Sequence, residues 1–181
     1  MKKTCARGLW IFALGLSLAC VAPAQTKVPL VAGFDVFKLG MPLTELKAAL
    51  KNNSFFLYEG DPDVTLLSRP NTSLIDVPGI TYFSRGVFQL LDGTLYSITL
   101  ELNPVQLDYF AMYTTLSKKY GDPVALDPSI ARWETPAVRL TLERPLTVKY
   151  LDMPRFVALQ KSGTAQKALQ NLTREKFLEN F

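Results

Sequence analysis

The sequence contains no histidine, and its only two cysteines, Cys5 and Cys20, lie near the start of the 181-residue chain. Histidine is the commonest acid or base near neutral pH, and it completes the usual serine and cysteine catalytic groups. After Cys20 the chain offers no thiolate nucleophile, no disulfide and no zinc ligand of the Cys or His type. We therefore expect a domain that needs no cofactor and no metal, and that lacks the commonest hydrolase mechanisms.

Short catalytic motifs are missing as well. The chain holds no Gly-x-Ser-x-Gly, no Ser-x-x-Lys and no phosphate-binding loop. The chemistry that remains uses carboxylates, hydroxyls and lysines, and it includes the hydrolysis of a glycosidic bond in peptidoglycan by a pair of carboxylates. The acidic candidates for such a pair are Glu59, Asp61, Asp63, Asp76, Asp92 and Glu134.

The acidic segment 59–63 has a simpler explanation, because the glycine and proline within it are turn-forming residues. It does not match an EF-hand calcium loop either. With Asp61 as the first position, Leu66 stands where glycine is needed and Thr72 where glutamate is needed. We interpret the segment as a solvated turn, and Asp92 as part of a hairpin turn.

The N-terminus has the order of a secretory signal peptide over residues 1–24. Basic residues at positions 2, 3 and 7 precede an uncharged apolar run, Leu9–Leu18, and a stretch of small residues follows it. The pattern Ala22-Pro23-Ala24 is typical of a signal-peptidase site. We predict cleavage after Ala24, which makes Gln25 the new N-terminus.

Two alternatives stay open at this end of the chain. A retained membrane anchor would need about 20 apolar residues, which the run reaches only if Pro23 is counted. Lipidation at Cys20 is the other alternative, although Ser17 stands where bacterial lipoboxes usually have leucine. Acyl chains would tether the protein to a membrane surface, so we expect a membrane as partner only if Cys20 is lipidated.

Removal of the signal changes the charge balance. Lys2, Lys3 and Arg7 account for three of the 20 basic residues and for none of the 16 acidic ones, so 17 basic residues remain against 16 acidic ones. The basic character belongs to the signal, and we expect no nucleic-acid partner. A cysteine-free mature domain of 157 residues (181 minus 24) fits the periplasm or an outer-membrane-associated location, and it is long enough for one domain.

The first half of the mature chain is expected to begin with a short lead-in over 26–37, for which an edge strand is one alternative. A helix from Pro42 to Leu50 is expected next, because leucines recur there at helical spacing and asparagines follow. Short strands are expected at 54–58 and 64–67. The proline-rich segment 69–79 is expected to be a loop.

Residues 80–103 have the pattern of a hairpin, with apolar and polar residues alternating in the second strand. The turn is marked by Asp92-Gly93. A two-residue turn would set polar residues opposite the apolar row. We therefore predict a three-residue loop with Gly93 in a left-handed bulge, which places Phe88 and Leu90 beside Tyr96 and Ile98.

A second helix is predicted from Pro104 to Tyr120, with Asn103 as its cap. Its aromatic and apolar side chains share one face. We assign this face to packing on a sheet rather than to a ligand groove. The face comprises Tyr109, Met112, Tyr113, Leu116 and Tyr120.

Strands are expected around Trp133, over 138–142 and over 146–150. An amphipathic helix is expected over 164–180, separated from the rest by Ser162-Gly163. Glu134 beside Trp133 could line a sugar site, since aromatic rings stack on sugars, but we interpret Trp133 as a core residue.

The element order predicts an α+β fold, an antiparallel sheet with helices packed on one face. The chain then divides into a signal peptide (1–24), a single α+β domain (25–160) and a C-terminal amphipathic helix (161–181). Two degenerate helix-plus-hairpin repeats, over 46–102 and 116–150, are compatible with this order, although no string of residues repeats.

The phrase Gly40-Met41-Pro42-Leu43-x-Glu45-Leu46, which opens a helix leading to a hairpin, resembles the SmpA/OmlA (BamE) type of small bacterial envelope protein. Pro42 stands where those proteins usually have serine or threonine, and this chain is longer. The resemblance implies a non-enzymatic, protein-binding role in the envelope, and it transfers no binding residue.

Three functions follow from the sequence. The first is a non-catalytic envelope protein that binds a protein partner or assists envelope assembly. The second is a periplasmic module that binds a small ligand or a glycan through its aromatic residues. The third is a carboxylate-dependent hydrolase that uses Asp61, Asp63 and Glu134. The sequence indicates no oligomeric state.

Overall fold

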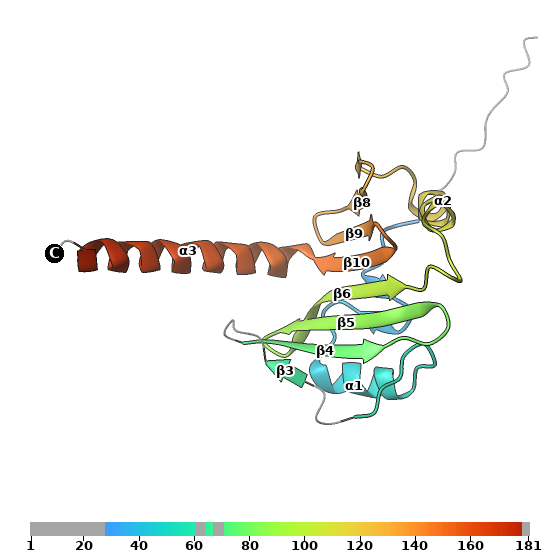
Figure 1. Cartoon of the computed structure of the whole chain (residues 1–181), viewed down its shortest axis with the longest axis horizontal. Helices are drawn as coiled ribbons and strands as arrows, with labels where there is room; N and C mark the ends of the chain where they lie inside the picture. Colours follow the sequence, from blue (N-terminus) through green and yellow to red (C-terminus); the bar gives the residue numbers. More distant parts are fainter. Residues whose placement is uncertain (1–27, 61–63, 67–70, 179–181) are drawn as a thin grey trace, which may run out of the picture.

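An eight-stranded antiparallel sheet forms the centre of the computed structural model, which describes residues 28–60, 64–66 and 71–178 (Figure 1). The helices in this part of the chain are α1 (Leu43–Lys51), α2 (Tyr109–Tyr120) and α3 (Met153–Leu178). The small ribbon consists of β1 (Gly33–Phe34) and β2 (Phe37–Lys38). The sheet strands are β3 (Val64–Leu66), β4 (Thr72–Pro78), β5 (Phe83–Leu91), β6 (Thr94–Leu102), β7 (Ala125–Leu126), β8 (Ile130–Glu134), β9 (Val138–Glu143) and β10 (Thr147–Asp152).

The two halves of the sheet repeat the same order of elements. The strand order is β3-β4-β5-β6-β10-β9-β8-β7, with α1 before β3–β6 and α2 before β7–β10 in the chain. The halves meet where β6 pairs with β10. The predicted α+β class is confirmed, and the unit that repeats is a helix with four strands rather than a helix with one hairpin.

One continuous apolar row crosses the sheet and explains where the helices pack. Successive register partners along this row, all of them buried, are Ile75, Phe88, Ile98, Tyr150, Leu140 and Trp133. Residues in register point to the same face. The buried side chains of α1 and α2 belong to the same core cluster as this row. Both helices therefore cover one face of the sheet, as predicted.

Phenylalanine rings dominate the core of the first half. Phe88 of β5 is fully buried, and its ring centroid lies 5.0 Å from that of Phe37 and 5.7 Å from that of Phe56. Phe34 of β1 contacts Phe83 of β5 at 5.3 Å. Aromatic pairs at these separations stabilise a core beyond their buried area, so the β1–β2 ribbon is held to the sheet by ring contacts.

The segment that resembles the envelope proteins has a structural role. The backbone N–H of Gly40 donates to Leu95 O (2.7 Å), Leu95 N–H donates to Met41 O (2.8 Å) and Leu43 N–H donates to Gly93 O (2.9 Å). These bonds attach the start of α1 to the turn between β5 and β6. The residues of this segment are therefore explained by their role in anchoring the start of α1 to the sheet.

The β5–β6 turn differs from the predicted one. Leu91 pairs with Thr94, so Asp92 and Gly93 form a two-residue turn, and both have the positive φ (52° and 70°) of a type I′ turn. The bulge lies further along, where Tyr96 is the extra residue between the Gln89–Ser97 and Leu90–Leu95 pairs. The prediction of a three-residue loop with Gly93 as the bulge was wrong, because a bulge within the strand restores the apolar register equally well.

The prediction of a loop over 69–79 was wrong for its described residues, since Thr72–Pro78 forms β4 between β3 and β5. Pro78 is tolerated because it is the last residue of the strand, where its missing N–H costs little. The strand expected at 54–58 is reduced to a single bridge between Phe56 and Gly79. The strand expected at 64–67 is confirmed as β3.

Helix α2 begins later than predicted. Asp108 is its cap, with its side chain accepting a hydrogen bond from Ala111 N–H at 2.9 Å. Asn103 caps only a preceding turn, through Val105 N–H at 3.0 Å. The predicted packing face is confirmed, since Leu116 and Tyr120 are buried and the other members of the face pack against the core.

Strand β10 continues into α3 without a loop. The strand ends at Asp152 and the helix begins at Met153, where Asp152 accepts a hydrogen bond from Arg155 N–H at 3.0 Å. The predicted break at Ser162-Gly163 was wrong, because a glycine inside a helix costs only about 1 kcal/mol. Helix α3 continues in the direction of β10 and projects from the body (Figure 1). Among the described helices, we find none with the length and apolar character that a membrane span requires.

Candidate functional site

Several residues singled out from the sequence lie outside the described part of the chain. They are Cys20, Ala24, Gln25, Asp61 and Asp63. Asp92 lies in the β5–β6 turn, and Glu59 lies in the irregular segment before β3. Among the described residues, no three acidic, histidine or cysteine side chains are grouped so as to hold a metal ion.

Asp76 lies on the polar face of the sheet and is ion-paired with Arg85 of the neighbouring strand. Arg85 Nε donates to Asp76 Oδ1 at 2.8 Å, and a second guanidinium nitrogen donates to Oδ2. Arg85 also lies 3.7 Å from a Glu101 carboxylate oxygen. The hydrogen bonds from Arg85 hold the pKa of Asp76 below its ordinary value, so this carboxyl stays ionised at neutral pH.

Glu134 is ion-paired in the same way at the other side of the sheet. Arg139 donates to both of its carboxylate oxygens, at 2.9 and 3.1 Å, and Arg132 Nε lies 3.6 Å away. The hydrogen bonds from Arg139 lower the pKa of Glu134. A general acid needs a raised pKa, and Glu134 has the opposite perturbation.

Asp76 and Glu134 do not form a catalytic pair. They lie on β4 and β8, which are five strand spacings apart in the sheet order. At about 4.8 Å per spacing the separation is roughly 24 Å, whereas glycosidase carboxyls lie about 5–9.5 Å apart. The described acidic residues therefore give the hydrolase hypothesis no support.

Trp133 does not line a sugar site. It is 3% exposed, its ring centroid lies 6.3 Å from that of Tyr113 of α2, and its Nε1–H donates to Gly121 O at 2.7 Å. The indole joins β8 to the end of α2. The interpretation of Trp133 as a core residue is confirmed.

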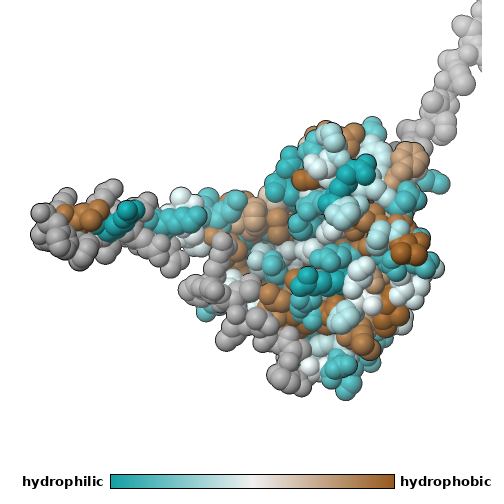
Figure 2. Space-filling model, viewed as in Figure 1, coloured by the Kyte–Doolittle hydropathy of each residue, from teal (hydrophilic) through white to brown (hydrophobic). Residues whose placement is uncertain are grey.

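A surface groove lies where α2, β7 and the β9–β10 turn meet, and we call it the aromatic groove. Its volume is about 490 Å³. Two of its apolar side chains are mostly exposed, Phe110 at 74% and Leu126 at 61%. Apolar surface is visible at the α2 end of the body in Figure 2. The lining residues are Tyr109, Phe110, Tyr113, Leu126, Asp127, Pro128 and Arg144.

Arg144 is held in a fixed position in the aromatic groove. Its guanidinium carbon lies 4.2 Å from the ring centroid of Tyr109, within cation–π distance. Its Nε donates to Pro128 O at 2.8 Å, and its backbone N–H donates to Ser129 O at 2.9 Å. Burial raises the pKa of the Tyr109 hydroxyl, so this ring is neutral beneath the cation.

Asp127 stabilises the turn at the end of β7. Its Oδ1 accepts hydrogen bonds from the hydroxyl and backbone N–H of Ser129, both at 2.7 Å, and from Ile130 N–H at 2.9 Å. These bonds, led by that from the Ser129 hydroxyl, lower the pKa of the Asp127 carboxyl. The carboxylate shapes the groove wall.

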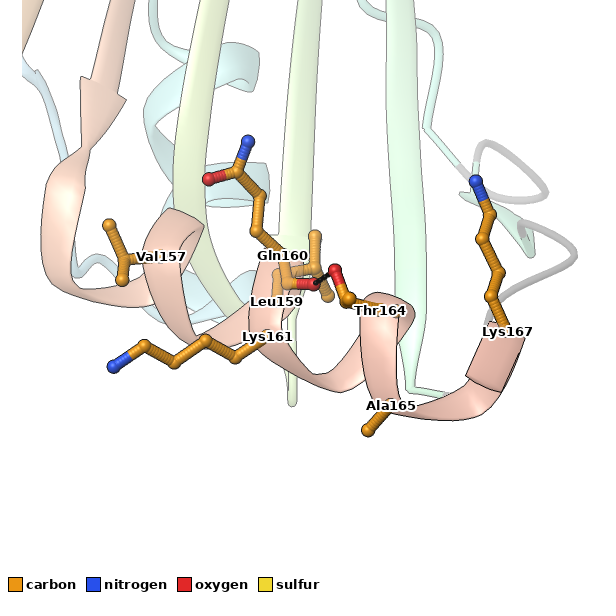
Figure 3. A pocket seen from close by; sticks show the side chains of 8 residues that line it. Val157, Leu159, Gln160, Lys161, Thr164, Ala165 and Lys167 are labelled. Atoms are coloured by element: carbon orange, nitrogen blue, oxygen red, sulfur yellow. Dashed lines mark hydrogen bonds between the residues drawn. The ribbon is translucent and has the colours of Figure 1, made fainter. Parts of the chain in front are cut away.

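Two other surface hollows are larger in volume than the aromatic groove but lack its combination of an exposed aromatic ring and a fixed arginine. One of about 860 Å³ follows the exposed first half of α3, and its side chains point in different directions without converging polar groups (Figure 3). The hydrogen bond drawn there, Thr164 Oγ1 to Gln160 O at 2.9 Å, lies within the helix itself. The other, about 620 Å³, lies beside α1 between Glu45 and Phe55. Of these three hollows in the described part of the chain, the aromatic groove combines an exposed aromatic ring, that of Phe110, with a fixed cation.

Sequence reasoning did not find the aromatic groove, because its residues come from three separate elements. The aromatic stripe of α2 was correctly assigned to the core, and Phe110 lies outside that stripe. A large aromatic residue on the polar face of a helix is the signal that could have indicated an exposed binding surface.

The fold and this groove define a two-unit α+β domain with a surface groove next to an edge strand. Residues 32–162 match the family model of the TP0088 domain, so the chain belongs to the TP0088 domain family. No curated protein and no solved structure gives a match to the chain. The comparisons give no support to the resemblance of the 40–46 phrase to SmpA/OmlA (BamE) proteins.

Proposed function

We propose that this chain is a non-catalytic component of the bacterial cell envelope that binds a protein partner through the aromatic groove. The observation that carries the proposal is the presence of two exposed apolar side chains, Phe110 and Leu126, in the same groove as a fixed arginine, Arg144. Aromatic residues and arginine are the types that dominate binding energy at protein interfaces.

A glycan-binding role is less favoured by the same geometry. Sugars stack on open aromatic faces, but the face of Tyr109 is covered by Arg144 at 4.2 Å. Tyr113 is directed partly toward the core, where its ring contacts Trp133. Phe110 alone offers a largely open ring, which fits an apolar contact with a protein better than a sugar platform.

A paired substitution tests the proposed contact. Wild-type protein and a Phe110→Ser/Leu126→Ser variant would be used to capture partners from envelope extracts under mild detergent, followed by quantitative mass spectrometry. We expect one partner to be enriched by the wild type and its recovery to fall at least about tenfold with the variant, because exposed hot-spot residues each contribute about 2 kcal/mol. The captured partner would then be purified and titrated against both forms.

The matched control is Val36→Ser, which removes a similarly exposed apolar side chain (48%) from the turn between β1 and β2. Surface changes of this kind alter stability by about 0.5 kcal/mol or less, so all three proteins should melt at similar temperatures. Equal recovery of the partner by wild type and double variant would contradict the proposed contact surface.

The envelope location is also a proposal, and intact-mass analysis of the protein isolated from its host tests it. We expect a mass that corresponds to residues 25–181, and a Cys20→Ser variant should be processed in the same way. A mass with acyl chains on Cys20 would indicate the membrane-tethered form instead. Recovery of the unprocessed chain from the cytosol would contradict export altogether.

A further inference from the structure

The guanidinium group of Arg144 is only partly engaged. Its Nε donates to Pro128 O, and its terminal nitrogens have no hydrogen-bond partner among the described residues. No carboxylate in this part of the structure lies within 4.0 Å of its nitrogens. Arg85 and Arg139, in contrast, each form two hydrogen bonds with a carboxylate. Arg144 is thus a fixed cation with an open, two-donor edge.

The acidic residue of the groove, Asp127, is ionised, but it forms no ion pair with Arg144. Asp127 directs Oδ1 to three donors of its own turn, from Ser129 and Ile130. The remaining lining of the groove is aromatic, aliphatic or proline. The groove therefore presents, within the described structure, an unpaired guanidinium group beside apolar side chains, which complements a carboxylate next to an apolar residue.

The neighbouring backbone favours a chain in extended conformation. Strand β7 is the outermost strand of the sheet on this side, and it pairs only with β8 within the described residues. An extended segment placed along a free strand edge can continue the sheet and put alternate side chains into adjacent pockets. Leu126 of β7 lines the groove, so a segment added there would lie beside Phe110 and Arg144.

We propose, on the basis of the protein-binding role above, that the aromatic groove recognises an extended partner segment in which a glutamate or aspartate lies close to a large apolar residue. Arg144 binds the carboxylate through its two terminal nitrogens. Phe110 and Leu126 contact the apolar side chain. Arg144 is therefore the residue that sets specificity, while the two apolar residues supply general affinity.

A peptide panel tests this specificity. Each blocked octapeptide would carry one phenylalanine or leucine and one glutamate, separated by zero to two glycines, in a glycine-serine frame, and each would have a glutamine counterpart. Binding to the processed full chain would be followed by NMR titration or calorimetry. We expect the best glutamate peptide to bind about tenfold more tightly than its glutamine counterpart, because the carboxylate forms charge-assisted hydrogen bonds.

Variants assign the effect to named residues. Arg144→Gln should bind both peptides of a pair equally and weakly, and Arg144→Lys should keep part of the preference. Lys161→Gln removes the same charge from exposed α3 and should leave the preference unchanged. Phe110→Ser should weaken both peptides alike.

The outcomes separate the two proposals. If peptides bind the groove without a preference for glutamate, or if Arg144→Gln retains that preference while folded by circular dichroism, the charge recognition is wrong and the protein-binding role stands. If no peptide of the panel binds, the charge recognition is also overturned, and the capture experiment with the Phe110→Ser/Leu126→Ser variant then decides the protein-binding role independently.

Discussion

Replacing Phe88 by alanine is expected to lower the free energy of unfolding by about 3–5 kcal/mol. The side chain is fully buried in the middle of the apolar row, between Ile75 and Ile98 on the neighbouring strands. Its ring also contacts Phe37 and Phe56, so the substitution removes aromatic contacts as well as buried area. A domain of this size is typically stable by only about 5–15 kcal/mol. Urea denaturation followed by circular dichroism measures the loss.

Phe110→Ala is the matched control, because it makes the same chemical change at a ring that is 74% exposed. Its effect on the free energy of unfolding should stay within about 0.5 kcal/mol. The difference between the two variants isolates the contribution of burial. A loss below about 1 kcal/mol for Phe88→Ala would show that the ring does not lie in the core of the first half.

The second large effect is expected at Trp133, which plays the equivalent part in the other half. Trp133→Ala should cost about 3–5 kcal/mol, because the indole is 3% exposed and packs between β8 and α2. Trp133→Phe retains most of the apolar area but leaves Gly121 O without its 2.7 Å donor. An unsatisfied buried carbonyl costs about 1–3 kcal/mol, so the phenylalanine variant should lie between wild type and alanine.

Fluorescence adds a local measurement to this comparison, since the only other tryptophan is Trp10 in the predicted signal peptide. In the processed protein Trp133 is therefore the sole indole, and its emission should shift to longer wavelength on unfolding. Emission at the wavelength of a water-exposed indole in the native protein would contradict the packing of α2 on β8.

The helical and strand periodicities of the sequence were sufficient to predict the α+β class. Leucines at helical spacing located α1, and alternation located β6, β9 and β10. The spacing of apolar residues in these elements reflects which side chains are buried, because each helix or strand packs one face against the rest of the fold. The α+β class and the single covered face followed from them, whereas β4 and β7 were not predicted.

The exact ends of helices, strands and turns were harder to predict from the sequence, because alternative end residues have similar energies. Pro70 and Pro78 in the sequence made β4 resemble a loop, although Pro78 is the last residue of the strand. Asn103 is as good a cap by type as Asp108, and only the tertiary structure selects the second. The same limit applies to the β5–β6 turn, where two bulge positions satisfy the same apolar register.

The aromatic groove could not be predicted at all from spacing. Arg144 follows β9, Phe110 is in α2 and Leu126 is in β7. Their proximity depends on β8 and β9 folding back between β7 and β10. The sequence instead predicted a set of candidate carboxylates. Two of them, Asp76 and Glu134, form ion pairs with arginines on the polar face of the sheet.

The direct passage from β10 into α3 has a mechanical consequence. A pull on the distal end of α3 is transmitted along the axis of β10 without a slack connection to absorb it. β10 has β6 on one side and β9 on the other, so its ladder bonds resist the load together, in shear, rather than opening one after another. Helix α3 is therefore coupled to an interior strand at the junction of the two halves, and tension applied there would be borne by both halves of the domain at once.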